Sequence, residues 1–345
     1  MAILILGIES SCDDSSVAII NDKKEILAHV TYTQKIEHTP YGGVVPEIAA
    51  RSHLSYLPEL IKQALADAKI NLSDLSAISV TSGPGLIGGL IVGVVLAQSM
   101  ASALNIPIIP INHLEGHALA PMITENITFP YLLLLVSGGH TQCLIAHEIG
   151  KYEMLGSTLD DALGETFDKL AKMLNLEYPG GPAVEKLAKL GDSNRYNLPM
   201  PLYKREGCNF SFSGLKTSLK NTIEQQKLNK ALDSQNINDI CASFQKTILN
   251  ILQDRLKNAF KIYEQTTTDK NLVISGGVAA NQFLKSNISK FGFEHGYNVF
   301  FPPLKLCTDN GAMIAWAGME RYRLGAYDKQ LRIIEPKARW PLSEL

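Results

Sequence analysis

Short apolar runs separated by polar turns mark strands along the whole chain. In the first third, strands are predicted at Ile3–Ile8, Val17–Ile20, Ala77–Thr81 and Ile106–Ile109. Glu9–Ser16 is a polar turn between the first two, and Pro46 begins a helix that Pro58 is expected to interrupt and restart. The apolar stretch Leu86–Leu104 predicts a buried helix between lobes.

The scheme of strand, small polar turn and strand recurs later, at Tyr131–Val136, Ser137–Gln142 and Cys143–Ala146. Two such hairpins about half a chain apart predict a duplicated fold whose two lobes face each other. Further helices are predicted at Leu159–Leu174, Ile240–Tyr263 and Ala312–Arg323, and further strands at Leu272–Ser275 and Val299–Phe301. This alternation predicts an α/β protein with mixed sheets and helices on both faces.

Two segments leave alternatives open. Asp161, Glu165 and Asp168 form one stripe of a predicted helix, which is either a solvated surface or a face aimed at a cation or at ligand hydroxyls. Gly207–Lys216 looks like an exposed loop with aromatic residues between small polar ones. It either stacks bases or packs its two phenylalanines into the core, and packing is the favoured interpretation.

Composition adds few constraints on function. The 345 residues contain 46% hydrophobic and 19% charged residues, which is typical of a globular protein with room for two domains. A net charge of −2 gives no overall electrostatic attraction to nucleic acid, so any RNA contact needs local patches or other subunits. Five cysteines without Cys-x-x-Cys spacing favour a reducing cytoplasm over disulfides or a thiolate zinc site. No targeting sequence is expected.

Leu86–Leu104 is long and apolar enough to cross a membrane, and it carries no charged residue. Ser82–Gly85 opens it as a strand-to-helix turn, and polar residues interrupt it at Gln98 and Ser99. We therefore expect a helix of the protein core and no membrane partner.

Candidate metal chemistry is concentrated in Ile111–Pro121, INHLEGHALAP. Asn112 has the spacing of a capping box with Glu115, so a helix is expected to begin here. His113 and His117 would then lie one turn apart on one face, close enough to hold a single cation. Gly116 supports a ligand, because glycine inside a helix is unfavourable and suggests close approach of another group.

Three strand-to-glycine turns, at Ser82–Gly89, Ser137–Thr141 and Ser275–Asn281, accompany the acidic hairpin Glu9–Ser16. None matches the Walker motif or the dinucleotide-binding Gly-x-Gly-x-x-Gly motif with its downstream acid. Together they resemble the actin-like ATPase (ASKHA) fold of sugar kinases and heat-shock ATPases, in which paired lobes clamp phosphates.

One family shares a longer set of motifs with this chain. The motifs include IESSCDDSSVAI (8–19), SGPGLIGGLIVG (82–93), NHLEGH (112–117), LVSGGHT (135–141), GETFDK (164–169), YPGGPAVE (178–185), ISGGVAAN (274–281) and TDNGAMIA (308–315). They are ordered along essentially the whole chain, which therefore resembles the TsaD family of tRNA adenosine threonylcarbamoyltransferases, formerly called glycoproteases.

The resemblance implies an acyltransferase. Its reaction moves the threonylcarbamoyl group of threonylcarbamoyl-AMP to the exocyclic amine of adenosine 37 in tRNAs that read codons beginning with adenine. It implies partners too: a metal-lacking paralogue (TsaB-like) and a small P-loop ATPase (TsaE-like).

The resemblance also implies site residues. Its metal ligands fall on His113, His117 and Asp309, for one divalent ion that is expected to be Fe²⁺, with Zn²⁺ or Mn²⁺ as alternatives. Its substrate contacts fall on Leu135, Val136, Ser137, Gly138, Gly139, Asp168, Gly181, Glu185 and Asn281. Glu185 is carried over only weakly, because relatives vary there.

Asp13 and Asp14, at the tip of the acidic hairpin, are the candidates for general base or for substrate positioning. Some relatives have Glu where this chain has Asp14, which shortens the side chain by one methylene. For Asp309, helix capping is an alternative to metal binding.

Two other functions compete with transfer. A metallopeptidase would need His-Glu-x-x-His, whereas Leu114 stands between His113 and Glu115 here. A non-catalytic ATP-binding module or a kinase would turn over ATP without a threonylcarbamoyl donor. The expected domain plan is an N-terminal lobe (1–110), a metal-binding helix between lobes (111–127), a C-terminal lobe (128–325) and a tail (326–345).

Overall fold

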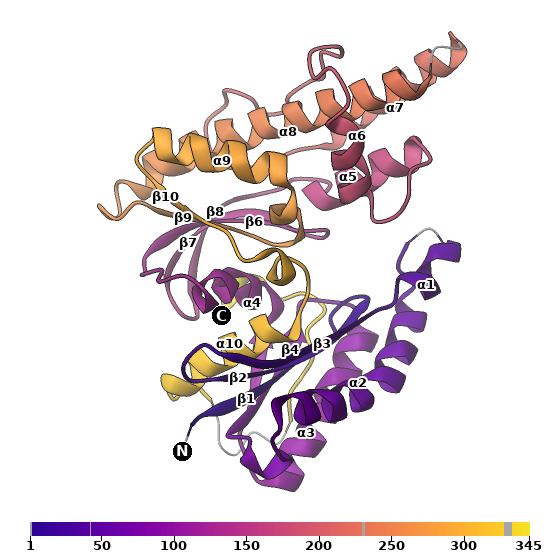
Figure 1. Ribbon diagram of the computed structural model, residues 1–345. Helices are drawn as coiled ribbons and strands as arrows, with labels where there is room; N and C mark the ends of the chain where they lie inside the picture. The colour runs from indigo at the N-terminus through magenta and orange to yellow at the C-terminus, as the bar shows by residue number, and fades with distance from the viewer. Residues whose placement is uncertain (1, 42, 230–231, 328–332) are drawn as a thin grey trace. The chain divides into compact units, whose positions relative to one another are not determined.

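The computed structural model describes residues 2–41, 43–229, 232–327 and 333–345, which form two compact units (Figure 1). The first unit takes in residues 1–126, 148–152 and 302–345, and the second takes in 127–147 and 153–301. The chain thus returns to the first unit at its C-terminal end, which places the described residues of the predicted tail with the N-terminal residues. Most of the predicted metal-binding helix, 111–127, also belongs to this unit. Residues 328–332 of that tail lie outside the described part.

The sheet of the first unit has the strand order β3-β2-β1-β4-β5. Its strands are β1 (Leu4–Glu9), β2 (Asp14–Asn21), β3 (Ile26–Thr33), β4 (Ala77–Gly83) and β5 (Ile108–Asn112). The pairs β1–β2 and β2–β3 are antiparallel, whereas β1–β4 and β4–β5 are parallel. The sheet is therefore mixed, as the sequence predicts.

The sheet of the second unit repeats this plan, with the order β10-β9-β6-β7-β8. Its strands are β6 (Tyr131–Val136), β7 (Thr141–Glu148), β8 (Lys151–Ser157), β9 (Asn271–Ser275) and β10 (Asn298–Phe300). Strand β6 pairs antiparallel with β7 and parallel with β9, as β1 does with β2 and β4. The predicted duplication is confirmed. The edge strands β3 and β8 were not predicted, because their apolar residues alternate with polar ones and do not form the continuous apolar runs of the predicted strands.

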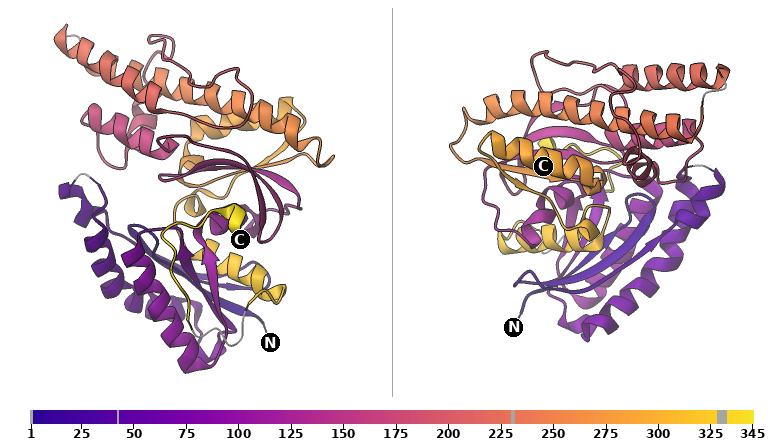
Figure 2. Two further views of the ribbon diagram at one scale, coloured as in Figure 1. Left: turned by 180° about the vertical axis from the view of Figure 1, so that it is seen from behind. Right: turned by 45° about the horizontal axis from the view of Figure 1, so that its top comes forward.

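Helices cover both faces of the first sheet (Figures 1 and 2). The helices of the first unit are α1 (Lys35–His38), α2 (Pro46–Ala68), α3 (Ile87–Leu104), α4 (His113–Leu119) and α10 (Gly311–Arg323). Those of the second unit are α5 (Leu163–Met173), α6 (Gly180–Ala188), α7 (Ser213–Leu228), α8 (Ser234–Tyr263) and α9 (Gln282–Glu294). Helices α2 and α3 lie on one face of the first sheet, and α10 lies on the other with α4 beside it.

Glycines allow α10 to approach the first sheet closely. A Cβ added to Gly7 of β1 would lie 2.4 Å from the backbone nitrogen of Ala315, and one added to Gly318 would lie 2.4 Å from Ser79. A Cβ added to Gly311, the first residue of α10, would lie 2.6 Å from the backbone nitrogen of Ala18 in β2. This packing fixes the N-terminal end of α10, which directly follows Asp309.

Helix α3 is only one-third buried, so the prediction of a buried helix is wrong. Its buried side includes Gly93 and Val94, whereas Ile87, Ile91 and Val95 are 46–57% exposed. By length and composition it is the one helix in the described residues that passes as a candidate membrane span. The result is an apolar stripe at four-residue spacing on the surface of the first unit.

Helix α2 runs without a break through Pro58, so the predicted restart at this proline is wrong. Ala49 and His53 before the proline share one buried face with Leu57 and Ile61 around it. Packing against β2 and β3 therefore outweighs the cost of an interior proline.

Two of the three acids in the predicted stripe, Asp161 just before α5 and Glu165 within it, pair with lysines, which spacing within one helix did not reveal. Asp161 contacts Lys169 at 2.8 Å and Lys216 at 2.6 Å, and Glu165 also contacts Lys169. Burial alone would raise the pKa of Asp161, but the two lysines lower it on balance. Asp161 and Glu165 thus have a structural role.

The expectation of an exposed loop at Gly207–Lys216 is wrong. Phe210 and Phe212 are 1% and 0% exposed, and their rings stack with centroids 6.3 Å apart. The favoured alternative, packing, is confirmed, and α7 begins directly afterwards at Ser213.

Candidate metal centre

The predicted histidine helix forms as α4. The side-chain Oδ1 of Asn112 accepts from the backbone N–H groups of Leu114 (2.9 Å) and Glu115 (3.4 Å), which caps the helix. The Glu115 side chain contacts Arg321 instead of completing the predicted capping box. His113 and His117 are 7% and 0% exposed, with ring centroids 4.8 Å apart.

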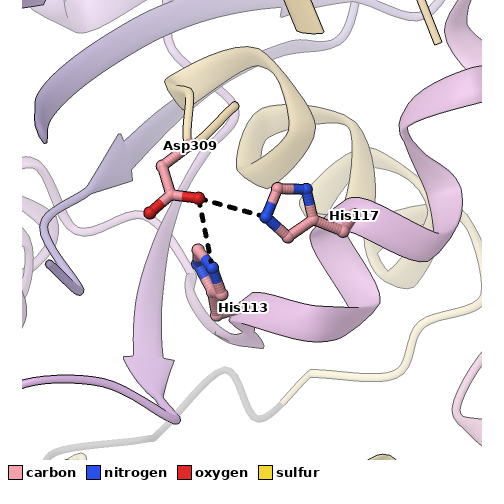
Figure 3. Close-up of side chains that lie close together, drawn as sticks. All are labelled: His113, His117 and Asp309. Carbon is pink, nitrogen blue, oxygen red and sulfur yellow. Dashed lines mark hydrogen bonds and ion pairs between the residues drawn. The ribbon is translucent and has the colours of Figure 1, made fainter. Parts of the chain in front are cut away.

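Asp309 lies against both imidazoles (Figure 3). Its Oδ1 is 3.4 Å from Nε2 of His113 and 3.1 Å from Nε2 of His117. The alternative that Asp309 caps a helix is wrong, because the cap of α10 is Asn310, whose side chain accepts from the Met313 N–H at 2.9 Å. Residues 192 positions apart in sequence are thus brought together by the packing of α10.

This donor set fits a divalent transition-metal ion. One ligand atom from each of the three residues lies within 4.8 Å of the other two. Two imidazole nitrogens and one carboxylate oxygen suit iron(II), zinc or manganese and leave coordination positions open for a substrate. Within the residues that the structure describes, this is the one such group.

Glu9, which the sequence did not identify, orients the first histidine. Its Oε2 is 3.0 Å from Nδ1 of His113 and accepts from the Thr81 hydroxyl at 2.5 Å. Its Oε1 accepts from the backbone N–H of Ser11 at 2.6 Å. A carboxylate on Nδ1 favours the tautomer whose Nε2 lone pair points at the metal position. The sequence feature that could have identified Glu9 is its position directly after the predicted buried strand Ile3–Ile8.

Charge balance in the site depends on a cation. Burial alone would raise the pKa of Asp309, but His113 and His117 lower it on balance to well below its usual range. Burial would lower the pKa of His113, but Asp309 and Glu9 raise it well above its usual value. One imidazole thus faces two carboxylates, so a proton on His113 offsets only one of their two negative charges, whereas a divalent ion would balance both.

The acidic hairpin lies in the same unit. Burial, followed by repulsion from Asp309, raises the pKa of Asp14 to about 7. That value suits a general base at neutral pH. Asp13 is half-buried, and its backbone carbonyl accepts from the Gln34 N–H at 3.1 Å. The buried imidazole of His53 supports the turn, with Nε2 donating to the Cys12 carbonyl at 3.0 Å.

The predicted phosphate-contacting turn follows β6, which ends with Leu135 and Val136. The Ser137 N–H donates to the His140 carbonyl at 2.8 Å, and the Ser137 carbonyl accepts from the Gly164 N–H at 3.1 Å. A Cβ at Gly138 or Gly139 would meet no atom within 4 Å. The two glycines therefore face open space, which leaves their backbone N–H groups room to meet a ligand.

The remaining predicted substrate residues are near the starts of α6 and α9. Asp168 accepts from the Gly180 N–H at 2.8 Å, and Gly181 faces open space. Asn281 caps α9 by accepting from the Leu284 N–H at 2.9 Å, and Glu185 accepts from the Gln282 N–H at 3.1 Å. The Asp168 and Glu185 carboxylates thus accept from N–H groups at the starts of α6 and α9, where the positive ends of the helix dipoles favour negative charge.

Gly116 has a different explanation from the predicted one. A Cβ there would lie 2.9 Å from Cδ1 of Ile314 and 3.2 Å from Cγ of Met313. The close approach that glycine permits is therefore to α10, not to a ligand.

Comparison with known proteins agrees with the sequence motifs. The family model described as TsaD, tRNA N6-adenosine threonylcarbamoyltransferase, matches residues 25–316. A relative from Rickettsia bellii, named tRNA N6-adenosine threonylcarbamoyltransferase, is 54% identical over 344 residues, or 99% of each chain.

Two solved structures share the fold. HypF from T. kodakarensis has a TM-score of 0.59 at 16% identity and covers 96% of this chain and 49% of its own. Component A of the Acidaminococcus fermentans (R)-2-hydroxyglutaryl-CoA dehydratase has a TM-score of 0.51 at 17% identity, covering 93% and 99%. These structures support the predicted actin-like architecture.

Proposed function

This chain belongs to the TsaD family of tRNA N6-adenosine threonylcarbamoyltransferases, and from that premise we propose that His113, His117 and Asp309 bind the metal ion of the transfer reaction. The enzyme transfers a threonylcarbamoyl group to the N6 amine of adenosine in tRNA. The observation that carries the metal assignment is the contact of both histidine Nε2 atoms with Asp309 Oδ1, at 3.4 and 3.1 Å. Fe²⁺ is the proposed ion, with Zn²⁺ or Mn²⁺ as alternatives.

The proposed donor is threonylcarbamoyl-AMP, and the proposed acceptor is adenosine 37. The amine nitrogen attacks the carbamoyl carbon, the bond to the phosphate oxygen breaks, and AMP leaves. When bound, the ion would supply Lewis acidity to the carbonyl or phosphate. Asp14, with its pKa raised to about 7, takes the proton that the amine loses, and Asp13 positions the substrate.

The second unit supplies the proposed donor-binding residues. Gly138 and Gly139, which follow Leu135 and Val136 of β6, offer backbone N–H groups to the phosphate. Ser137 shapes this turn, because its N–H donates to the His140 carbonyl at 2.8 Å. Asp168 accepts from ribose hydroxyls, and Gly181, Glu185 and Asn281 flank the adenosine. Open space at Gly139 and Gly181 supports this assignment.

The function is tested by depletion of the protein followed by mass spectrometry of tRNA nucleosides. Threonylcarbamoyladenosine should fall and should return when the wild-type protein is restored. Unchanged threonylcarbamoyladenosine on depletion would reject the assignment. ATP turnover or phosphoryl transfer without any threonylcarbamoyl donor would favour the kinase alternative. Against a metallopeptidase, Glu115 binds Arg321 and is not available as its base.

We propose that the enzyme works in the cytoplasm with a metal-lacking paralogue and a small P-loop ATPase. None of the five cysteines, all within the described residues, forms a disulfide, which suits a reducing compartment. The exposed stripe Ile87, Ile91 and Val95 on α3 supports the paralogue as its occupant. A paralogue would present an equivalent α3 face, so two apolar stripes can pack against each other.

An Ile91→Glu variant should therefore bind the purified paralogue at least about tenfold more weakly, because a buried charge at such an interface is costly. Isothermal titration calorimetry measures the effect. Ser99→Glu, on the same exposed face but beyond the apolar stripe, is the matched control and should bind more nearly as the wild type does. If Ile91→Glu bound the paralogue as tightly as the wild type does, the interface would not include this stripe of α3.

A further inference from the structure

Glu115 lies between the two histidines in sequence, yet its side chain contacts neither of them nor Asp309, and instead contacts Gly150, Tyr152 and Arg321. It is 0% exposed, and its Oε2 is 2.7 Å from both Nε and Nη2 of Arg321. Its Oε1 accepts from the Gly150 N–H at 2.9 Å and from the Tyr152 hydroxyl at 3.3 Å. Four donors thus satisfy a buried carboxylate that the transfer reaction does not use.

These contacts attach the histidine helix to α10 on the side away from the metal ligands. At 3.6 residues per turn, Glu115 points about 200° around α4 from either histidine. Arg321 is in the last turn of α10, whereas Asp309 directly precedes the N-cap of the same helix. Between these two contacts, Gly116 packs on Met313 and Ile314.

We infer that Glu115 and Arg321 form a positioning pair that holds His113 and His117 at the distance from Asp309 that metal binding requires. This inference rests on the proposed metal site. Rotation of α4 about its own axis would move the two Nε2 atoms away from Asp309. The same rotation would pull Glu115 away from Arg321 and leave a buried carboxylate and a half-buried guanidinium unpaired, so the pair opposes it.

Metal affinity, measured without tRNA, tests this role. Chelator competition should show that Glu115→Gln and Arg321→Gln each raise the Fe²⁺ or Zn²⁺ dissociation constant about tenfold, within the range for residues that orient ligands. The double variant should lose about as much as either single variant, because the two residues act as one unit. Arg321→Lys keeps the charge without the planar fork and should fall between wild type and Arg321→Gln.

Arg323→Gln is the matched control. Arg323 lies on the same helix and pairs with Glu320 at 2.6 Å, so removing its charge should leave the dissociation constant within about twofold. Circular dichroism of each metal-free protein shows which variants are folded, and only folded variants are compared. If the glutamine variants do not fold, the comparison of Arg321→Lys with the wild type still tests the inference.

Wild-type affinity in Glu115→Gln and Arg321→Gln would overturn the inference, and so would additive losses in the double variant. A wild-type protein that binds no metal would instead reject the proposed metal site. The two failures are therefore distinguishable.

Discussion

Asp309→Asn should weaken metal binding by more than about 100-fold, beyond the 10–100-fold typical of losing a residue that only orients a ligand. The amide keeps the size of the side chain and removes the negative charge that both histidines contact. Threonylcarbamoyladenosine formation should fall with the metal content. Inductively coupled plasma mass spectrometry of the purified protein, followed by nucleoside analysis of reacted tRNA, measures both.

Asp67→Asn is the control for this change, because Asp67 is an exposed carboxylate on α2 of the same unit. It should retain wild-type metal content and activity. If Asp309→Asn retained both as well, Asp309 would not be a ligand, and the proposed centre would lose its only carboxylate.

The parts of the fold that the sequence predicted are those in which burial imposes a simple pattern. Strand β6 is buried along its whole length, and its predicted limits coincide with the observed ones. Strand β3 alternates apolar residues with His29, Thr31 and Thr33 at the edge of the sheet, which is the pattern of a half-buried strand and differs from the continuous apolar runs of the predicted strands. Helix α3 is apolar all round but buried on one side only, which composition alone could not show.

The site divides in a similar way. His113 and His117 follow from helical spacing, but Asp309 is 192 residues from His117 and was reached only through the family resemblance. Glu9 and Arg321 escaped prediction because their partners are distant in sequence and have no local periodicity. Long-range pairs of this kind depend on the packing of α10 against β1 and α4, which tertiary structure alone reveals.

Gly7→Ala should lower the free energy of unfolding of the first unit by about 3 kcal/mol, at the upper end of the cost of overpacking a core. The new Cβ would lie 2.4 Å from both the Ala315 nitrogen and the Gly311 carbonyl oxygen. Both are backbone atoms, so the clash is relieved only if α10 moves away from β1. Asp309 precedes α10, so metal affinity should fall along with stability.

Denaturant unfolding monitored by tryptophan fluorescence isolates this effect, because Trp316 and Trp340 both lie in the first unit. Gly43→Ala in the same unit is the matched control, since its Cβ would meet no atom within 4 Å. That variant should be neutral or slightly more stable, because alanine reduces the conformational freedom of the unfolded chain. An unchanged midpoint for Gly7→Ala would mean that α10 is not seated on β1 as closely as the glycines indicate, and that the position of Asp309 has another cause.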